Sequence, residues 1–193
     1  MKLRGGILIK INHEFSTFLD IARYEKIVRN NDLISTVLNL ALLMENFTNI
    51  YIKEISPEEF NDIFLDKKQK QHFKLNVAKS LGLPRSLADA ITKLSGIRNN
   101  FAHKLDYELK DEEIIEFEQY VEKITAKEIC RSGALNYNEV DSFLSSGVKI
   151  KGSDDYTSNK VIGRLVNTTY MLANKAAFFS IDEFNRRGIL SLG

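Results

Sequence analysis

Apolar residues recur every three or four positions along most of this 193-residue chain, and only two prolines interrupt them. This spacing places apolar side chains on one face of an α-helix, and Pro57 and Pro84 stand where a new helix would begin. The connections between the expected helices are short, which favours antiparallel neighbours. The sequence therefore predicts an all-α fold, an up-and-down helical bundle. The expected helices cover about residues 12–29, 32–55, 57–64, 69–81, 84–105 and 111–127.

Three of these helices carry more specific predictions. Asp32 is placed to cap the start of the second helix, and Ser56 followed by Pro57 is expected to end it. The first and fifth helices should each bury one apolar stripe. The first stripe comprises Phe15, Phe18, Leu19, Ala22 and Ile27, and the second comprises Leu87, Ile91, Leu94, Ile97, Phe101 and Leu105.

The pattern changes after residue 127, where glycine and serine become frequent. One short helix, NEVDSFL, and a short strand, VKIK, are expected here, and this strand could pair with ILIKI near the N-terminus. A helical pattern then resumes at VIGRLVNTTYMLANKAAFF, followed by a short helix near IDEFNRR. We therefore expect a helical bundle over residues 1–127 and a mostly helical C-terminal extension over residues 128–193, packed on the bundle.

Composition indicates a cytosolic protein. Hydrophobic residues make up 44% and charged residues 27% of the chain, which is ordinary for a globular protein. The single cysteine, Cys130, excludes an internal disulfide framework and a cysteine-based zinc cluster. The apolar run near the N-terminus is too short for a signal peptide. Residues 33–52 are apolar but contain Asn39, Glu45, Asn46 and Asn49, which favours a buried helix over a membrane span.

Charge is unevenly distributed, although the formal net charge is only +1. Residues 67–104 contain nine Lys or Arg residues against one acid, whereas residues 105–128 contain nine acids against three lysines. Two interpretations remain open. The two blocks can form helix faces that complement each other, or the basic block can offer a surface to an anionic polymer.

A charged residue, Arg98, lies within the apolar stripe of the fifth helix. On a helical wheel it falls about 20° from Leu87, in the middle of the stripe. Burying an unpaired guanidinium is costly, so Arg98 must pair with an acid, extend to solvent or line a polar cleft. Glu45 shows the same anomaly on the second helix. We hypothesise that Glu45 and Arg98 are partners or line one cleft, with Asp20 and Glu25 as alternative partners.

His103 follows Arg98 by five positions, which corresponds to a rotation of about 140° on a helix. The two side chains can therefore share a site only if the helix loosens after Asn100 or if two protomers each contribute a copy. Asn99 lies four positions before His103 and could orient its imidazole. The alternative is a structural helix end, in which cationic side chains favour the helix dipole and His103 acts as a cap.

The remaining motifs predict neither a metal nor a cofactor. His13, His72 and His103 have no metal-ligand spacing such as HExxH, and His72 is expected to be a solvated helix residue. The chain also lacks GxGxxG, a Walker-type phosphate loop and GxSxG. We therefore expect no bound metal, no cofactor and no membrane partner.

The stretch IRNNFAH resembles the R-x4-6-H motif of the HEPN superfamily, with Arg98, four intervening residues and His103. The preceding segment, HFKLNVAKSLGLPRSLADAITKLSG, is similar to the branch that includes the mannitol operon repressor family. This resemblance covers about residues 10–127. It implies an α-helical homodimer whose arginines and histidines face one cleft, and a metal-independent endoribonuclease that serves as a toxin or defence effector.

The resemblance also implies roles for individual residues. Arg98 and His103 would be catalytic and Asn99 orienting, with Glu45 and Asn100 in support. A histidine can transfer protons to or from the ribose oxygens, and an arginine can stabilise charge on the phosphoryl oxygens. The products would be a 2′,3′-cyclic phosphate and a 5′-hydroxyl.

Other functions remain open. Members of the mannitol-repressor branch are described as transcriptional regulators, although this sequence shows no recognisable helix-turn-helix, and other HEPN-like proteins are non-catalytic interaction modules. An antitoxin or a regulatory protein would then be a partner. The third alternative is a structural bundle in which the motif only satisfies its own helix end.

Overall fold

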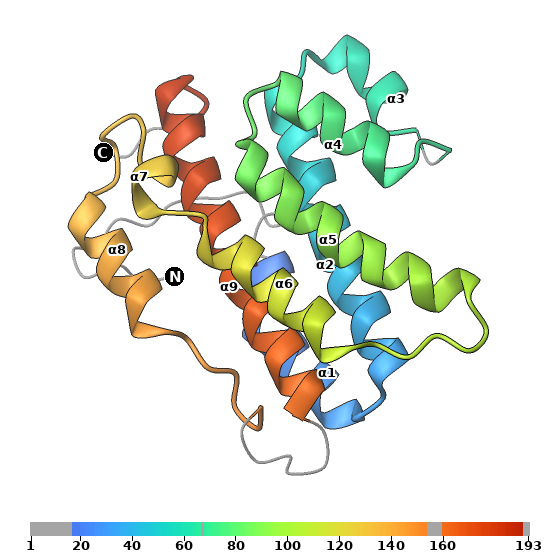
Figure 1. The fold of residues 1–193 in the computed structure, drawn as a ribbon. Coiled ribbons are helices and arrows are strands. Elements are labelled where there is room, and N and C mark those ends of the chain that lie inside the picture. The colour runs from blue at the N-terminus through green and yellow to red at the C-terminus, as the bar shows by residue number, and fades with distance from the viewer. Residues whose placement is uncertain (1–16, 67, 154–159, 191–193) are drawn as a thin grey trace.

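The computed structural model describes residues 17–66, 68–153 and 160–190, and these form an all-α bundle without a strand (Figure 1). The two longest helices, α2 and α9, lie at its centre, and the shorter ones pack around them. The helices are α1 (Ile21–Asn30), α2 (Leu33–Ile55), α3 (Asn61–Phe64), α4 (Gln71–Ser80), α5 (Arg85–His103), α6 (Asp111–Glu122), α7 (Ala126–Ile129), α8 (Tyr137–Ser146) and α9 (Lys160–Arg186), with 3-10 turns at Thr17–Leu19 and Glu58–Phe60.

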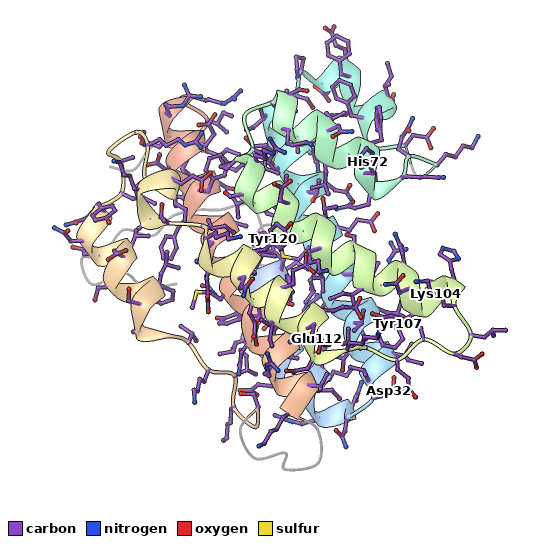
Figure 2. The ribbon with its side chains drawn as sticks, in the orientation of Figure 1. Asp32, His72, Lys104, Tyr107, Glu112 and Tyr120 are labelled. Carbon is purple, nitrogen blue, oxygen red and sulfur yellow. The ribbon has the colours of Figure 1, made fainter. Side chains whose placement is uncertain are left out.

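The predicted bounds of the second helix are confirmed. Asp32, labelled in Figure 2, has an extended backbone and accepts a hydrogen bond from the Ser35 backbone nitrogen at 2.6 Å, so it caps α2. The helix ends before Ser56 and Pro57, because proline restricts the residue before it to an extended conformation. Both ends are set by local contacts.

The first helix is shorter than the pattern indicates. The side chain of Asp20 accepts a hydrogen bond from the Ala22 backbone nitrogen and starts α1. Ala22 is exposed, and Tyr24 and Val28 belong to the buried face instead. Residues 12–16 lie outside the described part of the chain.

The C-terminal third differs from expectation in two places. A single helix, α9, covers the two helices expected there, because residues 176–184 are all buried and pack as one continuous helix; the Ser180 hydroxyl donates to the Ala176 carbonyl within it. VKIK forms no strand: the backbone nitrogen of Ile150 donates to the Asn167 side chain at 3.0 Å. The suggested partner of that strand, ILIKI, lies outside the described residues.

The sixth helix ends at Glu122, about five residues earlier than predicted. The Lys175 ammonium group, reaching across from α9, donates to the Val121 and Ile124 carbonyls at 2.7 Å each, which satisfies two buried carbonyls at the end of α6 and just after it. The side chain of Thr125 then caps α7 by accepting from the Glu128 backbone nitrogen. The contacts of Lys175 and Thr125 therefore separate α6 from α7, although the apolar pattern predicts one continuous helix.

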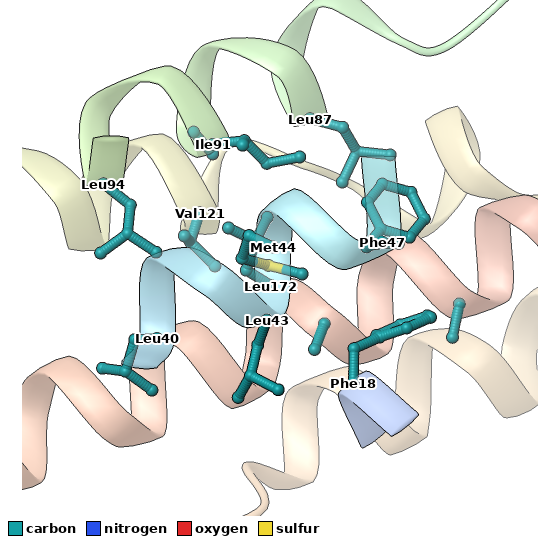
Figure 3. Packing of buried hydrophobic residues seen from close by; sticks show 14 of the residues in the cluster. Phe18, Leu40, Leu43, Met44, Phe47, Leu87, Ile91, Leu94, Val121 and Leu172 are labelled. Carbon is teal, nitrogen blue, oxygen red and sulfur yellow. The ribbon is translucent and has the colours of Figure 1, made fainter. Parts of the chain in front are cut away.

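One cluster of buried hydrophobic side chains runs through the bundle and contains residues from both sides of residue 127. Figure 3 shows the contact between α5 and α2, where Leu87, Ile91 and Leu94 pack over Met44 and Phe47. The longest interface joins α2 to α9, and α9 also packs against α1 and α6. The position of α5 on α2 fixes where Arg98 and Glu45 lie.

In the described part of the chain, α2 is the one helix long and apolar enough for a membrane span, with a mean hydropathy of 1.2. Half of that apolar window is buried against other helices. A buried core helix passes the same test, so this observation is weak evidence for a span.

Candidate functional site: a basic cleft between α4 and α5

The turn between α4 and α5 sets the two walls of the cleft. Gly82 has a φ of 107°, a backbone conformation that residues with a side chain rarely adopt. The Leu83 backbone nitrogen donates to the Ala78 carbonyl at 2.9 Å. The Leu81 carbonyl accepts hydrogen bonds from Tyr51 and from the guanidinium of Arg187. These contacts attach the turn to α2 and to the residue that follows α9, and they hold α4 beside α5.

A cleft of about 580 Å³ lies between the start of α4 and the second half of α5. Figure 2 labels His72 on α4, at one wall of this cleft. Glu45 of α2 contributes a carboxylate to its lining. The charged, histidine and amide side chains that line it are Glu45, Lys68, Gln69, Lys70, Gln71, His72, Arg98, Asn99 and His103.

The predicted pairing of Glu45 with Arg98 is present. A carboxylate oxygen of Glu45 lies 3.8 Å from a guanidinium nitrogen of Arg98, and its other oxygen lies 3.6 Å from the Lys74 ammonium. The Arg98 side chain is 32% exposed, so it reaches the cleft while it remains paired. The alternative partners are engaged elsewhere: Asp20 pairs with Arg23 and Glu25 pairs with Arg29.

Helix α5 continues without a break to His103, so the alternative in which it loosens after Asn100 is wrong. The Lys104 backbone nitrogen bonds to the Asn100 carbonyl and closes the last turn. Arg98 and His103 both line the cleft although they leave the helix in different directions. Leu105 lies beyond the helix end and is fully exposed, so its predicted place in the buried stripe is wrong.

Asn99, the predicted orienting residue, and Asn100, a predicted supporting residue, have different surroundings. Asn99 is exposed at the cleft, and no hydrogen bond joins it to His103 in the portion of the chain described. Asn100 does not line the cleft; its backbone carbonyl accepts from the Lys104 backbone nitrogen at the last turn of α5, and with Tyr107 it lines a separate hollow beside the following loop. Tyr107 also donates to Glu113 at 2.8 Å, and burial together with this carboxylate raises the pKa of Tyr107 to about 12. Asn100 therefore belongs to the contacts that hold the end of α5.

The structure adds three cationic or titratable residues that the motif does not contain. Lys68, Lys70 and His72 reach the cleft because the turn at Gly82 folds α4 back along α5. The basic block indicates Lys68 and Lys70 in the sequence, whereas nothing in the sequence indicates His72. Among the described residues lining the cleft, Glu45 is the single carboxylate, so cationic side chains predominate.

Acidic residues of the block 105–128 form ion pairs with α5 and α9 and do not line the cleft. Glu116 of α6 pairs with Lys93 of α5, and Asp111 and Glu118 pair with Arg164 of α9. Lys93 is thus the one member of the basic block that these pairs neutralise, and Arg164 lies outside that block, so the first interpretation holds for a single contact between the two blocks. Lys68 and Lys70 remain directed to the cleft, as the second interpretation requires.

No group of three or more His, Cys, Asp or Glu side chains suited to a metal ion occurs within residues 17–66, 68–153 and 160–190. His13 lies outside these ranges. No protein-family model matches the chain, and no curated protein and no solved structure matches it either.

Proposed function

We propose that this protein is a metal-independent endoribonuclease of the HEPN type, acting as an RNA-cleaving toxin or defence effector. The observation that supports the proposal best is that Arg98 and His103 line one open cleft whose other charged walls are mainly cationic. A polyanion gains affinity from such a surface. The cleft around Arg98 and His103 therefore suits the binding and cleavage of RNA.

Arg98 and His103 have different roles in the proposed reaction. The phosphoryl oxygens gain negative charge in the transition state, and a guanidinium can stabilise it through charge-assisted hydrogen bonds. An imidazole changes its charge between about pH 5 and pH 8, which suits transfer of a proton to or from a ribose oxygen. Glu45 supports Arg98 by holding its guanidinium at the cleft.

We further propose that the protein acts as a homodimer, in which the motifs of two chains approach each other. An exposed apolar stripe on α2 supports this: Ile34, Leu38 and Leu42 are 50%, 38% and 59% exposed and follow at intervals of four residues. Glu45 follows Leu42 by three residues, so the stripe leads toward the cleft. Light scattering can compare the wild type with a double variant, Leu38→Glu with Leu42→Glu. We expect a dimer for the wild type and a monomer for the double variant.

The function is tested by incubating the purified protein with structured and single-stranded RNA in EDTA. We expect cleavage that leaves a 2′,3′-cyclic phosphate and a 5′-hydroxyl. His103→Ala should lower the rate by about 10² to 10⁴, the usual contribution of one acid–base group. Arg98→Ala should also lose activity, whereas Arg85→Ala, an exposed arginine of the same helix, should keep it. Cleavage that EDTA abolishes, or that survives His103→Ala, contradicts the proposal.

A non-catalytic module of the mannitol-repressor type is the second candidate. The exposed stripe on α2 favours it as well, because an unpartnered apolar face suits a protein partner such as an antitoxin or a regulatory protein. This candidate predicts that no RNA is cleaved and that His103→Ala leaves partner binding unchanged. The RNA assay therefore separates the two candidates.

A further inference from the structure

Two histidines from different helices face the same cleft. His72 is the second residue of α4 and His103 is the last residue of α5, and Arg98 lines the cleft with them. We infer that His72 is a second catalytic residue, and that His72 and His103 of one chain form the acid–base pair of the reaction. This inference rests on the proposed RNA cleavage.

The chemistry requires two proton transfers. The 2′-oxygen attacks phosphorus, a P–O2′ bond forms and the P–O5′ bond breaks. The proton of the 2′-hydroxyl passes to a neutral imidazole, and an imidazolium gives its proton to the departing 5′-oxygen. Exchange with water then restores both rings. Attack and departure take place on opposite sides of phosphorus, so two separated groups serve better than one.

The environment of His72 suits such a role. The amide nitrogen of Asn76 lies 3.4 Å from its Nδ1. An amide can donate to Nδ1 when the ring is neutral and, after rotation, accept from Nδ1–H when the ring is charged. Asn76 can therefore orient the ring in both protonation states and leave Nε2 available. The His72 side chain is exposed, so RNA can reach it.

The charged groups around His72 come from three elements. Lys68 and Lys70 precede it in the chain, Arg98 and His103 belong to α5, and Glu45 belongs to α2. Glu45 is engaged by Arg98 and Lys74, so the two histidines are the remaining side chains of the cleft that are suited to acid–base catalysis. The lysines would bind neighbouring phosphates.

The inference is tested by the dependence of kcat on pH for wild type, His72→Gln and His103→Gln. We expect a bell-shaped profile for the wild type, a loss of one limb in each variant, and a fall in kcat of about 10² to 10⁴. A 4-nitrophenyl ester of a nucleoside 3′-phosphate needs no acid for its leaving group. It should restore the rate of one of the two variants. Lys68→Gln, the matched control in the same cleft, should keep both limbs and raise KM.

Mixing the two histidine variants shows whether both groups act within one chain. If each chain contributes one histidine to a shared site, a heterodimer of the variants regains one intact site. We expect no such recovery. Two results would overturn the inference and leave the proposed function standing. One is a wild type that cleaves RNA together with a His72→Gln variant that keeps both limbs of the pH profile. The other is recovery of activity on mixing the two variants. A wild type that cleaves no RNA overturns both.

Discussion

Glu45 and Arg98 form an ion pair across the interface between α2 and α5, with 3.8 Å between a carboxylate oxygen and a guanidinium nitrogen. The same carboxylate lies 3.6 Å from the ammonium group of Lys74, which is buried on α4. One acid thus holds cations from both walls of the cleft. An uncompensated buried ammonium is costly, so the carboxylate also stabilises the packing of α4.

Replacing this carboxylate by an amide should affect stability and activity together. Glu45→Gln leaves Lys74 buried without a counter-charge, and we expect the free energy of unfolding to fall by about 1 to 3 kcal/mol, less than for a fully buried pair because Glu45 is 26% exposed. RNA cleavage should fall because Arg98 loses its support. Urea unfolding and cleavage rates check this against Glu108→Gln, which removes the same charge from an exposed loop residue. Equal stability of the two variants would contradict the role assigned to Glu45.

The lysines at the cleft should contribute affinity for RNA that depends on salt. In a His103→Ala background, Lys68→Ala with Lys70→Ala should weaken RNA binding and reduce the slope of log affinity against log salt by about 0.7 for each lost phosphate contact. Lys26→Ala with Lys127→Ala is the matched control, because both lysines are exposed on helices that do not line the cleft. Fluorescence anisotropy with single-stranded RNA over a range of salt concentrations measures both slopes. A slope that changes equally in both double variants contradicts an RNA path through the cleft.

The sequence suggests the Glu45–Arg98 pair and names Asn99 and His103 beside it, whereas the wall of the cleft formed by α4 could not be predicted. Helical geometry makes two charges on otherwise apolar stripes candidate partners, but it leaves Asp20 and Glu25 open, and the contact at 3.8 Å decides between them. His72 carries no comparable signal, because its role depends on the fold of α4 against α5 at Gly82. Contacts between elements distant in the sequence decide such positions.

The distance of a contact along the chain also explains which helix bounds could be predicted. Asp32 caps α2 through a contact three residues away, which the sequence displays directly. The end of α6 depends on Lys175, more than 50 residues later in the chain. Ser180 and Asp182 are polar residues typical of a break, yet α9 continues through them because residues 176–184 are all buried and Asp182 accepts from the backbone of residues 131 and 132.

Asp182 should be among the most sensitive positions for stability. Its buried carboxylate accepts hydrogen bonds from the backbone nitrogens of Arg131 and Ser132 and from the Ser132 hydroxyl, each at 2.8 Å. Asp182→Ala leaves these donors without a partner, so the free energy of unfolding should fall by about 2 to 4 kcal/mol. Asp141→Ala, on exposed α8 surface, should change it by less than about 0.5 kcal/mol. Urea unfolding of both variants checks the difference, and similar losses would contradict the anchoring role.

Lys175 should make stability rise with pH. Burial lowers the pKa of Lys175 from 10.5 to about 8. Between these values the unfolded chain still holds the proton that the folded chain has released, so the unfolded state binds more protons and unfolding becomes less favourable as pH rises. Below about pH 8 both states are charged, and the cost of burying the ammonium group is constant.

The measurement compares the wild type with Lys175→Met by urea unfolding at several pH values between about 7 and 10.5. Other groups titrate in both proteins and cancel in the difference, provided that the fold is kept. The stability of the wild type relative to the variant should increase across this range. A constant difference would show that the pKa of Lys175 is not lowered by folding.

Two glycines in helices should respond oppositely to alanine. A Cβ on Gly163 of α9 would lie well inside contact distance of the Ser153 backbone carbonyl oxygen, so the loop or the helix must shift. Overpacking of this kind costs about 1 to 3 kcal/mol. A Cβ on Gly96 of α5 would have nothing within 4 Å of it, and there alanine should stabilise the helix by about 0.5 to 1 kcal/mol. Thermal unfolding should therefore show a lower Tm for Gly163→Ala and a higher Tm for Gly96→Ala, and a Gly163→Ala variant as stable as the wild type would contradict the close approach of residue 153 to α9.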